Sequence, residues 1–312
     1  MPKPKIVILQ GPTGVGKTET ALALAHHVPV EIVNADSLQF YRFMDIGTSK
    51  PRPAQQQMVP HHLFSILDPD EHFHAARYME LARKIIEEIL GRQHVPLVVG
   101  GTGLYIRALT RGLVNAPDRN EGLRTQLRRH SSAALFAELE RVDPDTAQRL
   151  KPNDTLRIIR ALEVFYQTGT TLSALQRQHN FATEPYQCLK LTLVRERSEL
   201  YRRIEQRVDQ MLAQGFEQEV RELLARGFSP NLRPLQSIGY RQMVALIQGR
   251  LTWETAVHEI KKATKRYAKR QMTWFRHDQG SVQVLLPEEQ EQIILRVKNF
   301  LNNTENLGKS YK

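Results

Sequence analysis

The stretch Gly11-Pro-Thr-Gly-Val-Gly-Lys17-Thr18 follows the apolar run Ile6-Val-Ile-Leu9 and precedes a helical pattern over residues 19–26. It matches the P-loop pattern G-x-x-x-x-G-K-[ST] in the setting that this pattern requires, between a strand and a helix. Successive backbone N–H groups of such a loop hold a phosphate, the lysine adds positive charge and the hydroxyl binds Mg²⁺. The motif therefore predicts a di- or triphosphate site, without saying which compound binds.

The first hundred residues alternate between strands and helices. Apolar runs of strand length cover 6–9, 31–34 and 95–99, and a helical pattern covers 75–90. Such alternation predicts an α/β fold, a P-loop NTPase-like parallel sheet flanked by helices. Ligands of these sheets bind at the carboxyl ends of the strands. The segments that follow two of these strands, Asp36-Ser37 and Gly100-Gly-Thr-Gly103, are therefore expected beside the P-loop.

The pattern changes after the first hundred residues. Residues 115–185 show helical patterns and no convincing strand, so we interpret them as an all-helical insertion domain. The core domain is then formed by 1–114 and 186–312. The helical patterns of the insertion cover 121–130, 132–141, 154–167 and 172–179.

After the insertion, the apolar run 189–194 predicts a strand that returns to the sheet. A long helix is expected over 198–226, with a break near Gly215. The remainder from Leu235 onward is expected to be mostly helical, and residues 302–312 to be frayed.

Composition narrows the class of protein. The 44 Lys and Arg against 33 Asp and Glu give the 312-residue chain a net charge of +11. This balance favours a polyanionic partner such as a nucleic acid, although a basic surface can also serve solubility alone. The single Cys188 excludes a disulfide framework, and the paired histidines lack the spacing of a metal site. Without a signal peptide or a membrane-length apolar run, the protein is expected to be cytoplasmic and to have no membrane partner.

Two of the loops carry candidate chemistry. Asp36 follows the second strand, where it could be a general base, a magnesium ligand or only an Asx-turn residue. The segment 100–103 stands where many P-loop ATPases have an acidic residue, which argues against a standard ATPase. Its glycines would let backbone N–H groups approach a ligand, and Thr102 would supply a hydroxyl. The alternative is a tight strand–helix turn whose glycines need positive φ angles.

A basic segment near the end of the chain suggests RNA binding. Residues 261–276 contain seven basic residues and no acidic one, with Lys262, Lys265, Arg266 and Lys269 expected along one helical face. The aromatic residues of this segment are interleaved with the basic ones. Cations for phosphates together with aromatic rings for bases favour single-stranded RNA as the partner. The alternative is a solvated face whose aromatic side chains pack into the core. The aromatic residues are Tyr267, Trp274 and Phe275.

Taken together, these segments resemble one family, the tRNA dimethylallyltransferases, which are also called tRNA isopentenyltransferases. The resemblance covers nearly the whole chain, and the run at 34–51 after a P-loop is its most specific part. General P-loop kinases lack the combination of that run with GGTGLY. The matching segments are GPTGVGKT (11–18), NADSLQFYRFMDIGTSKP (34–51), VPLVVGGTGLYIRAL (95–109), DTLRIIRALEVF (154–165), SIGYRQM (237–243) and KRQMTWFR (269–276).

The resemblance implies transfer of a dimethylallyl group from dimethylallyl diphosphate to N6 of the adenosine 3′ of the anticodon in tRNA. Asp36 would be the general base, Thr102 would stand beside the reacting centre and Lys17 would neutralise the leaving group. Mg²⁺ would be the cofactor, on Thr18. The diphosphate would be held by Gly11, Pro12, Thr13, Gly14, Val15, Gly16, Lys17, Thr18 and Arg207.

The resemblance also implies a set of tRNA contacts, with the helical insertion gripping the anticodon stem-loop. We expect the protein to be a monomer. Leu156 departs from the family, where many relatives have a polar residue, and Gly14-Val15 stands where many have Ala-Ser. The expected contacts are Asp36, Ser37, Leu38, Gln39, Thr102, Arg124, Leu156, Arg157, Ile158, Ile159, Arg160, Gln236, Ser237, Ile238, Gly239, Tyr240, Arg241, Gln242, Lys269, Arg270, Gln271, Met272, Thr273, Trp274, Phe275 and Arg276.

Two other functions remain open on the residues alone. A P-loop kinase acting on a small molecule or nucleotide would explain the loop and Asp36, but it would leave the basic segment 261–276 without a role. A non-catalytic RNA-binding protein would leave Asp36 and Thr102 without one.

Overall fold

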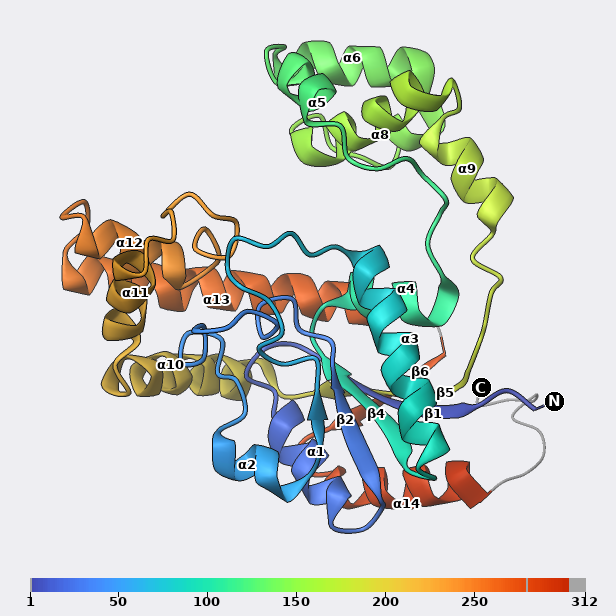
Figure 1. The fold of residues 1–312 in the computed structure, drawn as a ribbon, viewed down its shortest axis with the longest axis vertical. Helices are drawn as coiled ribbons and strands as arrows, with labels where there is room; N and C mark the ends of the chain where they lie inside the picture. The colour runs from blue at the N-terminus through green and yellow to red at the C-terminus, as the bar shows by residue number, and fades with distance from the viewer. Residues whose placement is uncertain (1, 279, 303–312) are drawn as a thin grey trace. The chain divides into compact units, whose positions relative to one another are not determined.

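The computed structural model describes residues 2–278 and 280–302, and the chain forms two units (Figure 1). The core unit contains residues up to Thr110 and from Pro185 onward, and the helical unit contains Arg111–Glu184. The sequence placed these boundaries at 115 and 185. The frayed end predicted for 302–312 lies, apart from Asn302, outside the described residues. Within the described residues, no helix combines the length and apolar character needed to cross a membrane.

The core unit is built on a six-stranded sheet in the order β3-β2-β4-β1-β5-β6, with every neighbouring pair parallel. The strands that the sequence predicts are confirmed. Of the two outermost strands, which were missed, β3 has only two residues, too few to show a period. β6 is as long as β2, and it was missed because the chain from Leu235 onward was interpreted as mostly helical. The strands are β1 (Lys5–Gln10), β2 (Val30–Asn34), β3 (His61–His62), β4 (Val95–Gly100), β5 (Gln187–Val194) and β6 (Ser281–Leu285).

Both faces of the sheet are covered, because a parallel sheet is apolar on both sides. On one face, Ile6 and Ile8 of β1 pack with α3 (Ala75–Gly91) and α4 (Gly103–Arg111). On the other face, Val7 and Leu9 pack with α1 (Lys17–Ala25) and α14 (Gln290–Asn302). The alternation along β1 thus divides the core into two clusters, and it leaves the carboxyl ends of the strands for the loops that follow them.

The helices after β5 form the rest of the core unit. The predicted long helix is divided at Gly215 (φ 94°) into α10 (Arg197–Ala213) and α11 (Phe216–Ala225), which confirms the expected break. The helix α13 (Trp253–Arg276) runs beside α10 and carries the whole basic segment 261–276 (Figure 1). Two shorter helices complete this unit, α2 (Pro53–Met58) and α12 (Tyr240–Ile247).

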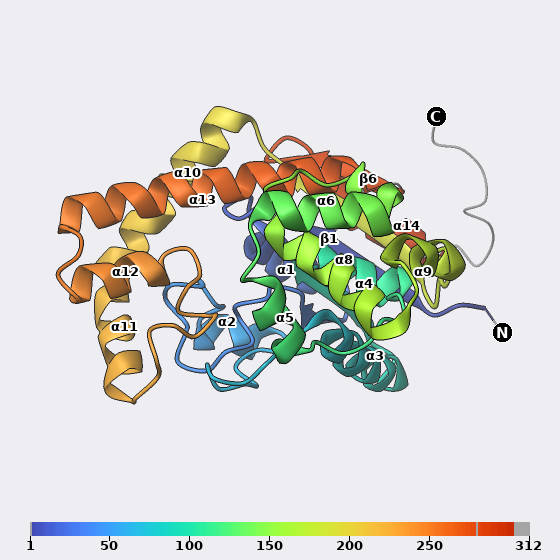
Figure 2. The same cartoon turned by 90° about the horizontal axis from the view of Figure 1, so that it is seen from above.

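The helical unit has its own small core, in which α6 and α8 lie side by side (Figure 2). At its centre, the fully buried carboxylate of Glu163 accepts hydrogen bonds from Arg124 at 2.7 and 2.8 Å, from Arg160 at 2.6 Å and from the Asn120 N–H. These partners hold the pKa of Glu163 at about 2, against the effect of burial. The helices are α5 (Glu121–Leu127), α6 (Ser132–Val142), α7 (Pro144–Ala147), α8 (Thr155–Thr168) and α9 (Leu172–His179).

Candidate active site

A glycine-rich loop, residues 11–16, joins β1 to α1 at the carboxyl edge of the sheet. Gly11, Gly14 and Gly16 all have positive φ angles, of 150°, 80° and 115°. A Cβ on Gly11 would lie 2.7 Å from the carbonyl oxygen of Leu193, so no larger residue fits there. Between these glycines, Val15 is fully buried and anchors the loop in the core. The loop therefore places its backbone at the N-terminus of α1, where N–H groups and the helix dipole favour an anion.

Two arginines that follow β5 fix the carbonyl groups of this loop. Arg195 Nε donates to the carbonyl of Val15 at 2.7 Å, and Arg203 Nε donates to that of Gly14 at 2.9 Å. Neither arginine was predicted as a site residue. Since Arg203 and the predicted Arg207 stand four residues apart on α10, helical spacing from Arg207 was the signal that could have found it. These contacts occupy carbonyl groups that would otherwise repel an anion.

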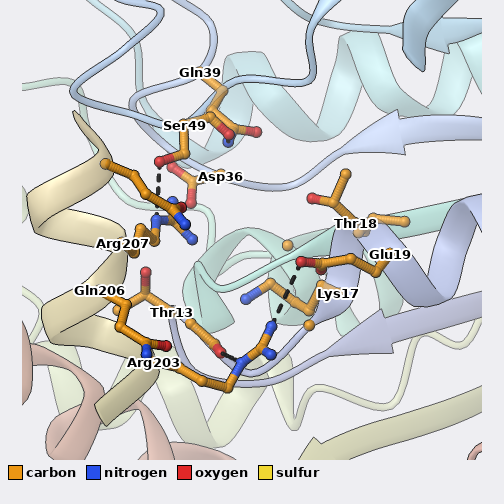
Figure 3. A pocket seen from close by; sticks show the side chains of 15 residues that line it. Thr13, Lys17, Thr18, Glu19, Asp36, Gln39, Ser49, Arg203, Gln206 and Arg207 are labelled. Carbon is orange, nitrogen blue, oxygen red and sulfur yellow. Dashed lines mark hydrogen bonds and ion pairs between the residues drawn. The ribbon is translucent and has the colours of Figure 1, made fainter. Parts of the chain in front are cut away.

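The loop lines a cavity of about 300 Å³ (Figure 3). Its charged walls are Lys17, Arg203 and Arg207, opposed by Glu19 and Asp36. A cavity in which cations and backbone N–H groups converge can hold a polyanion. The complete lining is Thr13, Gly14, Gly16, Lys17, Thr18, Glu19, Asp36, Gln39, Ser49, Val99, Gly100, Arg203, Gln206, Arg207 and Gln210.

The two predicted cations of this cavity are partly buried. Lys17 Nζ donates to the carbonyls of Gly11 and Pro12 at 2.9 and 2.8 Å, and burial lowers its pKa to about 8 although Asp36 acts in the opposite direction. Burial also lowers the pKa of Arg207, whose Nε donates to Ser49 Oγ at 2.9 Å. A buried cation costs free energy that a bound anion recovers. Both side chains are therefore suited to bind a negatively charged group.

Asp36 lies at the wall of the same cavity, half-buried. Its Oδ1 accepts a hydrogen bond from the Leu38 N–H at 3.1 Å, so the Asx-turn that the sequence left as an alternative is present. Within the described residues, its Oδ2 has no hydrogen-bond partner. One carboxylate oxygen thus fixes the turn, while the other is left for a ligand in the cavity.

The loop after β4 meets the loop after β2, as the sequence predicted. Thr102 Oγ1 accepts a hydrogen bond from the Ser37 N–H at 3.0 Å, and the Thr102 N–H donates to the Ala35 carbonyl at 3.1 Å. Gly100 permits this contact, because a Cβ there would lie 2.2 Å from the Ala35 oxygen. Glycine is therefore required at position 100 by a close approach and not, as the alternative had it, by a positive φ, which none of Gly100, Gly101 and Gly103 has. The role of the Thr102 hydroxyl toward a ligand stays a prediction.

The described residues contain no group of three or more His, Cys, Asp or Glu that could hold a metal ion. The hydroxyl of Thr18 and the carboxylates of Glu19 and Asp36 nevertheless line the anion cavity. Mg²⁺ usually takes one or two protein ligands together with phosphate oxygens and water. The donor set therefore fits a magnesium ion that arrives with a phosphorylated ligand.

Known proteins resemble this chain over nearly its whole length. A family model described as IPP transferase matches residues 39–278, and one described as isopentenyl transferase matches 4–62. The chain belongs to the tRNA dimethylallyltransferase family. It is 48% identical over 303 residues to tRNA dimethylallyltransferase of Desulfosudis oleivorans, covering 96% of each chain. It is also 51% identical over 277 residues to that of Syntrophobacter fumaroxidans, covering 88% of this chain and 81% of the other.

Solved structures agree with this family. The tRNA isopentenylpyrophosphate transferase of Bacillus halodurans has a TM-score of 0.73 and 36% identity, with 96% of this chain and 97% of the other covered. A eukaryotic dimethylallyltransferase acting on tRNA has a TM-score of 0.81 and 26% identity, with 98% of this chain and 81% of the other covered.

Several residues expected from the family resemblance to touch tRNA are buried, and these expectations need correction. Apart from Gly239, which has no side chain, their side chains fill the two cores or bind other parts of the protein, so these side chains are not exposed to RNA. Tyr240 donates its hydroxyl to Glu219 at 2.7 Å, and Gln242 caps its own helix by accepting from the Gly239 N–H at 2.9 Å. The buried residues are Ile158, Ile159, Gly239, Tyr240, Gln242, Gln271 and Phe275.

Two arginines that were predicted to contact tRNA instead bind another residue of the protein. Arg124 and Arg160 both bind Glu163, so their guanidinium groups stabilise the helical unit. The sequence did not reveal these ion pairs, because the other buried residues of the helix that contains Glu163 are all apolar. Other predicted contacts are exposed, namely Leu156, Arg157, Gln236, Arg241, Lys269, Arg270, Thr273, Trp274 and Arg276. The remaining ones, Ser37, Leu38, Gln39, Ser237, Ile238 and Met272, are partly buried.

The basic face of α13 lacks one predicted member, Lys265, and includes two more residues, Arg270 and Arg276. Lys265 turns toward α10 and pairs with Glu205, and Lys261 likewise pairs with Asp209 at 2.6 Å. The exposed residues Lys262, Arg266 and Lys269 follow one another at spacings of four and three, and Arg270 and Arg276 extend the same face. We call these five residues the basic face. Lys265 was misplaced because the carboxylates that attract it lie on another helix.

Proposed function

We propose that this protein transfers a dimethylallyl group from dimethylallyl diphosphate to N6 of the adenosine 3′ of the anticodon in tRNA. The observation that carries the proposal is the cavity itself, in which an anion cradle and a carboxylate line the same space. Lys17 and Arg207 form the cradle, and Asp36 lines the same cavity, with Thr102 on the adjoining loop. This is the pairing that an alkyl transfer from a diphosphate to a weak nucleophile requires.

The first task of the site is to stabilise the leaving group. As the bond between the dimethylallyl carbon and the bridging oxygen breaks, negative charge accumulates on the diphosphate. Lys17, Arg207 and the N–H groups of the glycine-rich loop would meet this charge with donors that are already in place. Mg²⁺ would be held by Thr18 Oγ1 and by diphosphate oxygens, and when bound it would neutralise part of the same charge.

The second task is to remove a proton from the exocyclic amine. The amine is a poor nucleophile because its lone pair is delocalised into the adenine ring, and it gains a positive charge as it attacks. Asp36 would accept the proton through the oxygen that the Asx-turn leaves unbound. Thr102 would orient the same end of the cavity, since its hydroxyl is fixed by the Ser37 N–H.

The third task is to bind the RNA. The basic face of α13 exposes five cations, and Trp274 is 41% exposed beside it. Trp274 also packs on Gly103, where a Cβ would lie 1.9 Å from its indole nitrogen. An exposed ring next to the loop of Thr102 would stack on a base near the reacting adenine, which must leave its own stack.

The proposal is tested by incubating the protein and Mg²⁺ with unmodified tRNA that has adenosine 3′ of its anticodon. One reaction contains dimethylallyl diphosphate labelled in the alkyl group, and another contains ATP labelled in the γ-phosphate. We expect label in the RNA from the first reaction only, and none when that adenosine is replaced by guanosine. Transfer from ATP without transfer from the prenyl donor would favour the kinase alternative.

The basic face makes a quantitative prediction about salt. Replacing Lys269 and Arg270 with glutamine should weaken tRNA binding and reduce the slope of log affinity against log salt by about 1.5, because two phosphate contacts are lost. Binding is measured by filter retention at several salt concentrations. Lys261→Gln is the matched control: this lysine is in the same segment but pairs with Asp209, so its loss should leave the slope nearly unchanged. Equal effects from both changes would contradict the assignment of the face.

A further inference from the structure

One buried amide joins the two sides of the cavity. Gln271 of α13 is 6% exposed, and its Oε1 accepts a hydrogen bond from the Thr13 N–H at 2.9 Å. Its Nε2 donates to the Gly101 carbonyl, also at 2.9 Å. Thr13 belongs to the glycine-rich loop, and Gly101 precedes Thr102. A single side chain therefore spans the loop of the anion cradle and the loop that lies against Asp36.

The contact with Gln271 requires a glycine at position 101. A Cβ on Gly101 would lie 2.3 Å from Gln271 Nε2, well inside the closest approach of real side chains. The same Cβ would also lie 3.3 Å from the Gly11 carbonyl oxygen. The amide of Gln271 thus reaches its second partner only because position 101 has no side chain.

Gln271 and the basic face lie on opposite sides of one helix. Residues 262 and 271 are nine positions apart. Nine residues make two and a half helical turns, so the two residues lie on opposite sides of the helix. The helix is also fixed just beyond its end, where Asp278 accepts hydrogen bonds from Gln10 Nε2 at 2.7 Å and from Lys190 Nζ at 3.1 Å. Gln10 and Lys190 lie on β1 and β5. The inner side of α13 is therefore anchored to the sheet beneath the cavity.

We propose that Gln271 is a positioning residue for prenyl transfer, which sets the separation between the diphosphate cradle and the loop of Thr102. This inference rests on the proposed function. The donor carbon must lie on a line between the leaving oxygen and the attacking amine, within about 3–3.5 Å of the amine, and an error of about 1 Å costs about 100-fold in rate. Gln271 fixes this distance from the inner side of α13, while the basic face of the same helix is free to bind RNA.

The test uses two replacements of Gln271 in the full-length protein. Gln271→Met keeps the volume and removes both hydrogen bonds, so kcat should fall by about 10- to 100-fold while tRNA affinity and its salt slope stay within twofold of wild type. In Gln271→Glu, an ionised carboxylate still accepts from Thr13 but repels the Gly101 carbonyl. Its protonated form donates to that carbonyl and reproduces both bonds. Its kcat relative to wild type should therefore rise as pH falls, because burial raises the pKa of such a carboxyl.

Lys17, at the start of α1, and Asp36, on the loop after β2, are the charged groups of the same cavity, and comparison with wild type at each pH removes effects common to both proteins. The matched control is Gln218→Met, at an exposed glutamine on α11, which should leave kcat and its pH profile unchanged. A wild-type-like kcat for Gln271→Met, or a pH-independent ratio for Gln271→Glu, would overturn the inference. If the first variant fails to fold, the pH ratio of the second decides. If wild type transfers no prenyl group, the proposed function fails, and with it the basis of this inference.

Discussion

Asp36→Asn is expected to lower kcat for prenyl transfer by about 10²- to 10⁴-fold, the contribution of a positioned general base. Asparagine retains an oxygen that can accept the Leu38 N–H, so the Asx-turn and the loop should keep their conformation. What is lost is the oxygen that can take a proton from the exocyclic amine. The rate is measured under single-turnover conditions with saturating donor and tRNA, and tRNA affinity should stay within a fewfold of wild type.

The control for Asp36 is a second carboxylate in the same cavity. Glu19→Gln removes one negative charge from the cavity wall, but Glu19 stands beside the N-terminus of α1, and its side chain is 69% exposed. Its replacement should change kcat far less than the loss of Asp36. If both variants lose activity equally, the loss comes from the changed charge of the cavity and not from the removal of a base. If Asp36→Asn keeps a near-normal kcat, Asp36 is not the base.

Lys17→Met should have an effect of similar size through the donor. The change removes the cation that would meet the charge of the departing diphosphate, and kcat/KM for dimethylallyl diphosphate should fall by about 10²- to 10³-fold. The carbonyls of Gly11 and Pro12 also lose their shared donor. Because Lys17 lies in the cavity and α13 is unchanged, tRNA affinity should stay near wild type. Donor-dependent kinetics at saturating tRNA separate the two.

An exposed lysine provides the control for Lys17. Lys298 lies on α14, so Lys298→Met removes the same charge without touching the cavity. Its kinetics should match those of wild type at equal ionic strength. A loss of tRNA affinity in Lys17→Met that exceeds its loss of donor kinetics would contradict the role assigned to Lys17.

The sequence predicted the parts of this site that depend on local pattern. The glycine-rich loop, Asp36 and Thr102 each follow a strand, and parallel strands bring their carboxyl ends to one edge. Contacts between segments far apart in the sequence left little signal: helical spacing from Arg207 pointed to Arg203, and nothing pointed to Arg195. Arg195 and Arg203 reach the loop across about 180 to 190 positions of sequence. Gln271 appeared to be one more member of a basic helix, because a polar residue on a buried face is visible only once its partners are placed.

Burial also separated residues that looked equivalent in sequence. Arg124 and Arg157 both lie in the helical unit, yet the first is bound to buried Glu163 and the second is exposed with Asp154. In α13, Lys265 and Lys269 are one turn apart, but acidic residues on α10 hold only the first. The charge pattern of a helix shows which cations it contains, but acidic residues on the neighbouring helix determine which of these cations stay on the surface.

The position of β1 in the sheet has a consequence for the order in which the protein can assemble during synthesis. β1 lies between β4 and β5, and β5 follows the entire helical unit in the chain. A nascent chain therefore displays the complete motif at 11–18 long before Arg195, Arg203 and Arg207 leave the ribosome. Because synthesis proceeds from the N-terminus, the loop is translated well before the three arginines that contact it or line its cavity. An N-terminal fragment could contain the whole motif and still have no cradle.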